Sequence, residues 1–150
     1  ALGASHLRLS VGAYQLTTKL VDGRFPDYER VIPRNGDKQI LANKQDLRRA
    51  LNRTAILSNE KFRGIRVNFS DGLVTLTTNN PEQEDAEETV PIEYTGAALE
   101  IGFNVGYLLD VLNVIRGETV KITVFDGNSS ALIEDPSVDS ALYVIMPMKL

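Results

Sequence analysis

One order of predicted elements, strand–helix–strand–strand–strand, occurs twice along this chain and limits the possible folds more than any other feature. In each copy an asparagine caps the helix, and a hairpin with Asp-Gly at its turn follows. The first copy has its elements at residues 38–42, 44–57, 65–69, 74–76 and 89–94, and the second at residues 99–103, 105–116, 120–124, 132–133 and 141–146. Two such units can set two helices side by side against a continuous antiparallel sheet, which buries one face of each helix. We therefore predict an α+β domain from about residue 31 onward.

The first predicted helix has one apolar and one basic face. Its apolar positions follow the 3.6-residue spacing of a helix and are Leu47, Ala50, Leu51, Thr54 and Ala55. The opposite face carries Arg48, Arg49, Asn52 and Arg53, with Lys44 at the start of the helix. Ile56 also falls on this polar side, where a core residue is not expected. The second helix has no basic residue before Arg116, so its charge does not support contact with a polyanion.

The segment before the repeat indicates a piece of something larger. The chain begins at Ala1 in the middle of a pattern in which apolar residues at 7, 9 and 11, and then at 14 and 16, alternate with polar ones. Two strands without an obvious upstream partner favour a fragment over a processed mature protein. Residues 20–37 contain several turn and breaker signals, including Phe25-Pro26 and Ile32-Pro33. We place a domain boundary there, near residue 31.

Composition argues against several classes of site. The 150 residues contain no cysteine and a single histidine, His6, so neither a zinc site nor a Ser–His–Asp arrangement is expected. The lack of cysteine is compatible with a reducing cytoplasm. No apolar run approaches the length of a membrane span, and neither a P-loop nor a GxGxxG motif occurs. A carboxylate-dependent nuclease stays open as an alternative, because its metal ligands usually come from separate strands.

Charge is divided unevenly along the chain. Residues 1–66 hold 13 basic and 6 acidic residues, a net charge of +7, whereas residues 67–150 hold 3 basic and 14 acidic residues, a net charge of −11. Lysine and arginine on a helix face bind phosphates without reading bases, and such binding weakens steeply with salt. Two ordinary solvated faces are the alternative. No aromatic stripe accompanies the basic residues, which argues against stacking on single-stranded nucleic acid.

Five segments are distinctive in sequence. They are Lys19–Tyr28 (KLVDGRFPDY), Ala55–Gly64 (AILSNEKFRG), Asn79–Glu84 (NNPEQE), Ile101–Val105 (IGFNV) and Tyr143–Leu150 (YVIMPMKL). All five resemble segments of the bacterial DNA polymerase III beta subunit family, and the last resembles the C-terminus of that family. The resemblance extends from about Thr17 to Leu150, and in combination the segments are specific; residues 1–16 match only in pattern.

The resemblance implies a DNA-clamp fold and the function of a sliding clamp, a ring that holds DNA polymerase on its template. Family members form rings of two subunits with three similar domains each, with helices lining the hole and sheets outside. Residues 1–30 would be the end of the middle domain and residues 31–150 the third domain. The implied partners are double-stranded DNA, bound without sequence specificity, and the polymerase subunits, clamp loader and repair proteins, which dock through short peptides. No catalytic residue, cofactor or metal is implied.

Position by position, the resemblance implies a hydrophobic pocket that accepts the partner peptides. The residues carried over to this pocket are Pro26, Arg30, Val31, Asn104, Tyr107, Ser130, Val144, Met146, Pro147, Met148, Lys149 and Leu150. Methionine suits such a surface, because it adapts to varied apolar partners. The opposite wall would belong to residues upstream of Ala1, so we expect the pocket to be half built in this chain.

The resemblance also implies a subunit interface and a DNA-facing surface. The interface would use Ile56, Leu57, Glu82, Glu84, Glu87 and Glu88, of which the glutamates lie in a predicted acidic loop at residues 80–88. The DNA-facing candidates are Arg24, Lys44, Arg48, Arg49 and Arg53. We expect these 150 residues not to close a homodimeric ring without the missing partner domain. The competing interpretations are the carboxylate-dependent nuclease and a generic peptide-binding module without a DNA role.

Overall fold

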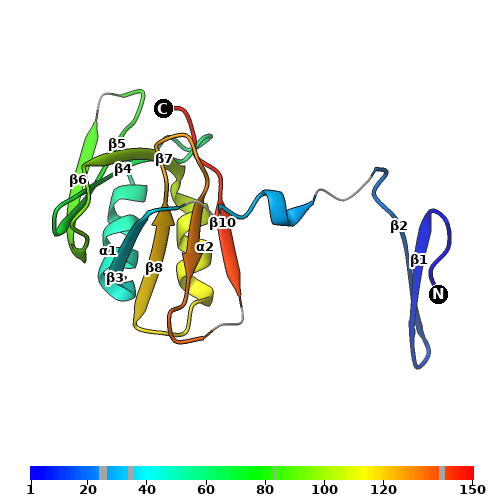
Figure 1. Cartoon of the computed structure of the whole chain (residues 1–150). Coiled ribbons are helices and arrows are strands. Elements are labelled where there is room, and N and C mark those ends of the chain that lie inside the picture. The colour runs from blue at the N-terminus through cyan, green and yellow to red at the C-terminus, as the bar shows by residue number, and fades with distance from the viewer. Residues whose placement is uncertain (24–26, 34–35, 83, 139–140) are drawn as a thin grey trace.

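Both copies of the predicted five-element unit are present in the structure (Figure 1). The computed structural model describes residues 1–23, 27–33, 36–82, 84–138 and 141–150. The first copy consists of β3 (Lys38–Asn43), α1 (Lys44–Ala55), β4 (Gly64–Ser70), β5 (Leu73–Asn79) and β6 (Asp85–Glu93). The second consists of β7 (Leu99–Asn104), α2 (Val105–Val114), β8 (Thr119–Val124), β9 (Ala131–Glu134) and β10 (Leu142–Ile145). The predicted duplication and the α+β class are therefore confirmed.

The eight strands of the two units form one antiparallel sheet in the order β10-β9-β8-β3-β6-β5-β4-β7. Strand β3 pairs with β8 along its whole length, but with β6 only at Leu41 and Ala42. The two halves of the sheet thus meet at a short junction. Helices α1 and α2 contact one another and lie against the sheet (Figure 1). This arrangement exposes one face of each helix, and neither helix covers the outer face of the sheet.

Each helix begins at an asparagine for the same local reason. The Asn43 side-chain oxygen accepts hydrogen bonds from the backbone N–H groups of Gln45 and Asp46, which a helix start otherwise leaves without partners. Asn104 does the same for α2. The helices are slightly shorter than predicted, since they end at Ala55 and Val114 and each is followed by an isoleucine that closes the last turn.

The core lies between the helices and the inner face of the sheet. Strand alternation buries Ile65, Val67 and Phe69 of β4 on this face, and the facing helices bury a stripe of apolar residues. The largest fully buried side chains come from both units: Phe69, Phe103, Ile40, Leu51, Ile65 and Leu76. Burying each such side chain contributes on the order of 2 kcal/mol, which makes this apolar layer the main source of stability.

The prediction of one acidic loop over residues 80–88 is wrong in its second half. Strand β6 begins at Asp85, and its residues 85–91 pair with β5. Along this stretch β6 has no strand on its other side among the described residues, because its pairing with β3 involves only residues 92 and 93. Carboxylates are tolerated there because Asp85 and Glu87 lie on the exposed face of the strand, and Glu88, on the other face, pairs with Arg53 of α1.

The N-terminal residues form a hairpin of their own. Strands β1 (His6–Val11) and β2 (Tyr14–Lys19) pair with each other and, in the described residues, with no other strand, and Gly12 takes a positive φ of 58° at their turn. A connector with the short 3-10 helix η1 (Tyr28–Arg30) leads from this hairpin to the main sheet, and Figure 1 shows the hairpin lying apart from the sheet. Within the described ranges, no helix has the length and apolar character needed to cross a membrane.

Candidate functional site

Residues 146–150, which we call the tail, run back to the sheet after β10. Met148 forms an antiparallel bridge with Gly102 of β7, and its N–H donates a hydrogen bond of 2.7 Å to the Gly102 carbonyl oxygen. The first unit contains the same pairing, since Glu93 at the end of β6 lies opposite Leu41 of β3. Leu41 and Gly102 each stand two residues before the asparagine that caps the next helix. The tail therefore continues the duplicated sheet pairing and is not a frayed end.

Asn104 caps α2 close in sequence to an exposed aromatic residue, Tyr107. Its Oδ1 accepts hydrogen bonds from the N–H groups of Gly106 at 2.8 Å and of Tyr107 at 3.4 Å. Its Nδ2 donates to the carbonyl oxygen of Phe62 at 3.2 Å, which ties the loop before β4 to the start of α2. Tyr107 exposes 61% of its surface. The cap thus fixes the position of a residue that has area available for an apolar partner.

Ser130 and Met146 contact each other next to the β9–β10 pair. The Ser130 hydroxyl donates a hydrogen bond of 2.9 Å to the Met146 sulfur, and Met146 is largely exposed. Val144 of β10 is partly buried and lies opposite Leu132 of β9. These contacts bring residues 130, 144 and 146 together at the end of the sheet from which the tail starts.

The connector side of the predicted pocket is described only in part. Pro26 lies outside the described residues, and so does the side chain of Arg30. Val31 is 42% exposed, and its N–H donates to the Tyr28 carbonyl oxygen at 3.0 Å. Within the tail, residues 147 and 148 are partly buried and residues 149 and 150 are exposed. The residues predicted for the pocket that the structure describes in full therefore come mainly from β9–β10, α2 and the tail.

A groove of about 730 Å³ borders the tail. Of the residues predicted for the pocket, Met148, Lys149 and Leu150 line it; the other lining residues are Asn59, Phe62, Gly64, Arg66, residues 77–81 and Asp85. Phe62 is 55% exposed, and the Lys61 ammonium lies 5.3 Å from its ring centroid. Phe62, Gly64 and Gly102 lie in segments that resemble the family, but sequence reasoning assigned them no role, because no local pattern indicates where the tail crosses the sheet.

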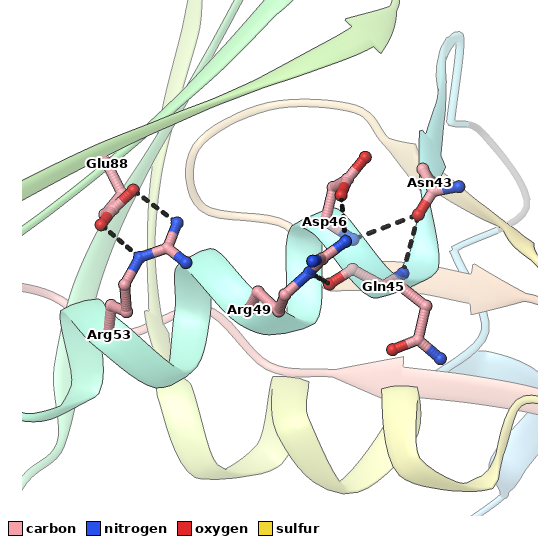
Figure 2. A network of polar contacts seen from close by, with 6 residues as sticks. All are labelled: Asn43, Gln45, Asp46, Arg49, Arg53 and Glu88. Carbon is pink, nitrogen blue, oxygen red and sulfur yellow. Dashed lines mark hydrogen bonds and ion pairs between the residues drawn. The ribbon is translucent and has the colours of Figure 1, made fainter.

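The polar face of α1 is held by hydrogen bonds within the chain, as Figure 2 shows. Arg49 Nη2 donates to Asp46 Oδ1 at 2.9 Å, and Arg53 donates to both carboxylate oxygens of Glu88 on β6. The Lys44 ammonium donates to the Ile115 carbonyl oxygen at 3.0 Å. The Arg48 guanidinium has no hydrogen-bond or ion-pair partner in the part of the chain that the structure describes. Among the described DNA-facing candidates, Arg48 is thus the least engaged; Arg24 lies outside the described residues.

The Arg53–Glu88 pair joins two surfaces that the sequence assigned to different roles. The hydrogen bonds from Arg53 lower the pKa of the Glu88 carboxyl and, reciprocally, raise the pKa of the Arg53 guanidinium. Both groups are therefore charged at neutral pH, and each neutralises the other. Figure 2 shows the pair near the C-terminal end of α1.

The residues predicted for the subunit interface lie on the same end of the domain. Ile56 follows α1 and is 79% exposed, whereas Leu57 is partly buried. Glu82, Glu84 and Glu87 are exposed, and Asn80 orders their loop, because its Nδ2 donates to Glu84 Oε2 at 2.8 Å. In the described ranges, no group of three or more His, Cys, Asp or Glu side chains is arranged to hold a metal ion.

Asp135 is a further polar centre that sequence reasoning missed. Its Oδ2 accepts hydrogen bonds from the N–H groups of Arg116 at 3.2 Å and Gly117 at 2.8 Å. Its Oδ1 accepts from the hydroxyl and the N–H of Ser137. These bonds, first of all the one from the Ser137 hydroxyl, lower the pKa of Asp135 to about 2. The carboxylate ties the turn after α2 to the loop after β9, which is a structural role.

The sequence of this chain is similar to a family of known proteins. Residues 29–149 match the family described as DNA polymerase III beta subunit, C-terminal domain. The chain belongs to this family. It is 58% identical over 149 residues to the beta sliding clamp of Pseudomonas aeruginosa and 52% identical to that of Escherichia coli, in each case over 99% of the chain. The chain spans 41% of the length of these relatives.

Solved clamp structures show the same fold. The Pseudomonas aeruginosa sliding clamp with ligand superimposes with a TM-score of 0.88 at 58% identity, over 99% of this chain and 41% of that one. The polymerase III beta subunit of Caulobacter crescentus gives a TM-score of 0.90 at 38% identity, over 99% and 40%. A third structure, of the Pseudomonas aeruginosa clamp bound to griselimycin, gives 0.86 at 58% identity over 99% and 40%. The predicted DNA-clamp fold is thus confirmed.

Proposed function

We propose that this chain is the C-terminal part of a bacterial sliding clamp, which acts as a processivity factor for the replicative DNA polymerase in the cytoplasm. The observation that carries the proposal is the tail, whose methionines contact Ser130, just before β9, and Gly102 of β7; Tyr107, near the start of α2, is exposed as well. A surface of exposed methionine and tyrosine on a rigid sheet end suits short apolar peptides. The subunit itself needs no catalytic residue, since its function is to hold DNA and partners.

In this proposal residues 1–30 end the middle domain and residues 31–150 form the third domain. Polymerase subunits, the clamp loader and repair proteins dock in the pocket, with Met146, Pro147 and Met148 as one wall and the connector residues Arg30 and Val31 beside it. The beta sliding clamp bound to griselimycin is a close relative of this chain. We propose that griselimycin binds this chain in the same pocket, which makes it a suitable test ligand.

The basic face of α1 contacts the DNA backbone in the ring, without base recognition. Arg48 is the strongest candidate, because its guanidinium is not engaged by a described residue, while Arg49 and Arg53 each hold a carboxylate. Contacts to phosphates give weak, salt-dependent binding that allows sliding. Ile56 and Leu57, with the glutamates at 82, 84, 87 and 88, form the joint to the next subunit of a homodimeric ring.

The decisive experiment is an NMR titration of the 150-residue chain with griselimycin, compared with a variant that lacks residues 148–150. We expect saturable shifts at Tyr107, Val144 and Met146 that the truncation abolishes. Shifts confined to other surfaces would contradict the pocket. If the 150-residue chain does not bind, the same titration is made with a full-length clamp that contains this sequence. Binding by the full-length clamp would mean that the opposite wall of the pocket is essential, and no binding would reject the pocket.

The DNA contact is tested separately, by fluorescence anisotropy of a short duplex at low salt. Replacing Arg48, Arg49 and Arg53 with glutamate should abolish binding by this chain, whereas Arg48→Ala alone should lower the slope of log affinity against log salt by about one unit. Unchanged DNA binding by the triple variant would favour a peptide-binding module without a DNA role.

A further inference from the structure

Two glycines on neighbouring strands, Gly64 of β4 and Gly102 of β7, lie directly under the end of the tail. Both face the side of the sheet away from the helices, because Gly64 shares the alternation of the exposed Arg66, and Gly102 lies opposite Arg66. A Cβ atom at Gly64 would be well inside van der Waals contact of Leu150 Cδ2. A Cβ atom at Gly102 would be well inside contact of the Met148 carbonyl oxygen and 3.0 Å from Leu150 Cγ. At Gly102 a larger residue therefore meets the backbone of the tail, and at Gly64 it meets the side chain of Leu150.

The backbone conformation does not explain these glycines. The positive-φ glycines among the described residues are Gly12, Gly23 and Gly72, so Gly64 and Gly102 have φ angles that any residue can adopt. A glycine inside a strand weakens the strand. Glycine nevertheless often occupies a strand position where another segment of backbone approaches closely. Here that segment is the tail.

We propose that Gly64 and Gly102 form a glycine seat for the tail, and that both are positioning residues for the partner-binding pocket. The inference rests on the proposed function. Met146 is held at one end by Ser130, and Met148 is held at the other by its hydrogen bond to Gly102. Pro147 between them has a restricted backbone. The seat thus keeps the wall of the pocket in one conformation before a ligand binds. Binding then does not include the entropic cost of ordering the tail, so the affinity is higher.

The two glycines contact different portions of the tail. Gly102 faces the backbone of Met148, which cannot withdraw without losing its hydrogen bond to the same strand. Gly64 faces the end of the Leu150 side chain, which can rotate away. Gly102→Ala should therefore displace the tail backbone, and Gly64→Ala should displace mainly Leu150. This difference supplies a matched pair of variants with the same added methyl group.

The test measures amide hydrogen exchange of Met148 in the free chain and griselimycin affinity in the same variants. For Gly102→Ala we expect Met148 exchange to accelerate by about tenfold or more and affinity to fall by about tenfold. For Gly64→Ala we expect a smaller loss of affinity with Met148 still protected. The losses of affinity caused by Leu150→Ala and Gly64→Ala should be non-additive in the double variant, because Gly64→Ala alone already displaces Leu150 from the seat.

Unchanged Met148 exchange in Gly102→Ala would overturn the seat, and a released tail with unchanged affinity would overturn its positioning role. Thermal unfolding accompanies each variant, and if Gly102→Ala does not fold, the non-additivity of Gly64→Ala and Leu150→Ala decides the proposal. Complete absence of griselimycin binding by a full-length clamp with this sequence would refute the proposed pocket and with it the positioning role. In that case Met148 exchange still decides whether the seat holds the tail.

Discussion

Arg53 of α1 and Glu88 of β6 form an ion pair through two hydrogen bonds, with Nε 2.5 Å from Oε1 and Nη2 2.8 Å from Oε2. One residue was predicted to face DNA and the other to face a second subunit. An arginine that gives two donors to a carboxylate has fewer left for phosphate, and a paired glutamate attracts a basic partner less. Whatever changes Glu88 at the proposed subunit joint therefore also changes the charge available on α1.

Arg53→Ala should raise the pKa of Glu88 toward the ordinary value of a glutamate carboxyl, because the hydrogen bond from Arg53 is the main cause of its lowered pKa. The folded pKa lies below the unfolded one, so the stabilisation is present above about pH 4.5 and is lost as pH falls through the lowered value. NMR titration of the Glu88 carboxyl carbon measures the shift. Arg49→Ala, which breaks the separate pair with Asp46, is the control; an unmoved Glu88 pKa in Arg53→Ala would contradict the pair.

Asp135 should make the protein sensitive to acid in a defined range. Its pKa is lowered from 3.8 to about 2, so its stabilisation is complete above pH 3.8 and is lost as pH falls toward 2. Asp135→Asn should lower the midpoint of urea unfolding at neutral pH and flatten the change of stability between these two pH values. Ser137→Ala, which removes the first of the carboxylate's hydrogen bonds, should give an intermediate result. An identical pH dependence in all three proteins would reject this role.

Replacing two apolar residues in the C-terminal part of α1 and just after it with alanine should change the stability by very different amounts. Leu51 is 1% exposed, and Leu51→Ala should cost about 2–5 kcal/mol of unfolding free energy, because it leaves a cavity between helix and sheet. Ile56 is 79% exposed, and Ile56→Ala should change stability by less than about 0.5 kcal/mol. Urea unfolding of the 150-residue chain measures both. A large loss for Ile56→Ala would mean that this side chain packs within the chain and is not available to a second subunit.

Local chemistry made much of this fold predictable. Alternation in the strands, the 3.6-residue stripes of the helices and the Asp-Gly turns each depend on neighbours in sequence, and they gave the duplicated unit in the correct order. The segment at residues 85–88 was misassigned because its carboxylates suggest a loop. The exposed strand face that carries Asp85 and Glu87, and the pairing of Glu88 with Arg53, arise only in the assembled domain.

The parts of the candidate site that the sequence did not reveal depend on segments distant along the chain. Arg53 and Glu88 are separated by 35 residues, and Gly102 and Met148 by 46; neither pair has a local signature. The family resemblance implied that the tail is a pocket wall but gave no reason for its path. That reason is the missing Cβ at two strand positions, which becomes apparent only when the tail lies across them.

The duplicated fold supplies an internal control for the role of Asn104. Asn43 and Asn104 cap equivalent helices, each accepting hydrogen bonds from two backbone N–H groups. Replacing either with alanine should therefore cost about 1 kcal/mol of unfolding free energy. Asn104 alone also donates to the Phe62 carbonyl oxygen and precedes the exposed Tyr107. Asn104→Ala should for this reason weaken griselimycin binding at a temperature where both variants are fully folded, whereas Asn43→Ala should leave binding unchanged. Equal affinities in the two variants would mean that Asn104 is a helix cap only and would remove it from the pocket.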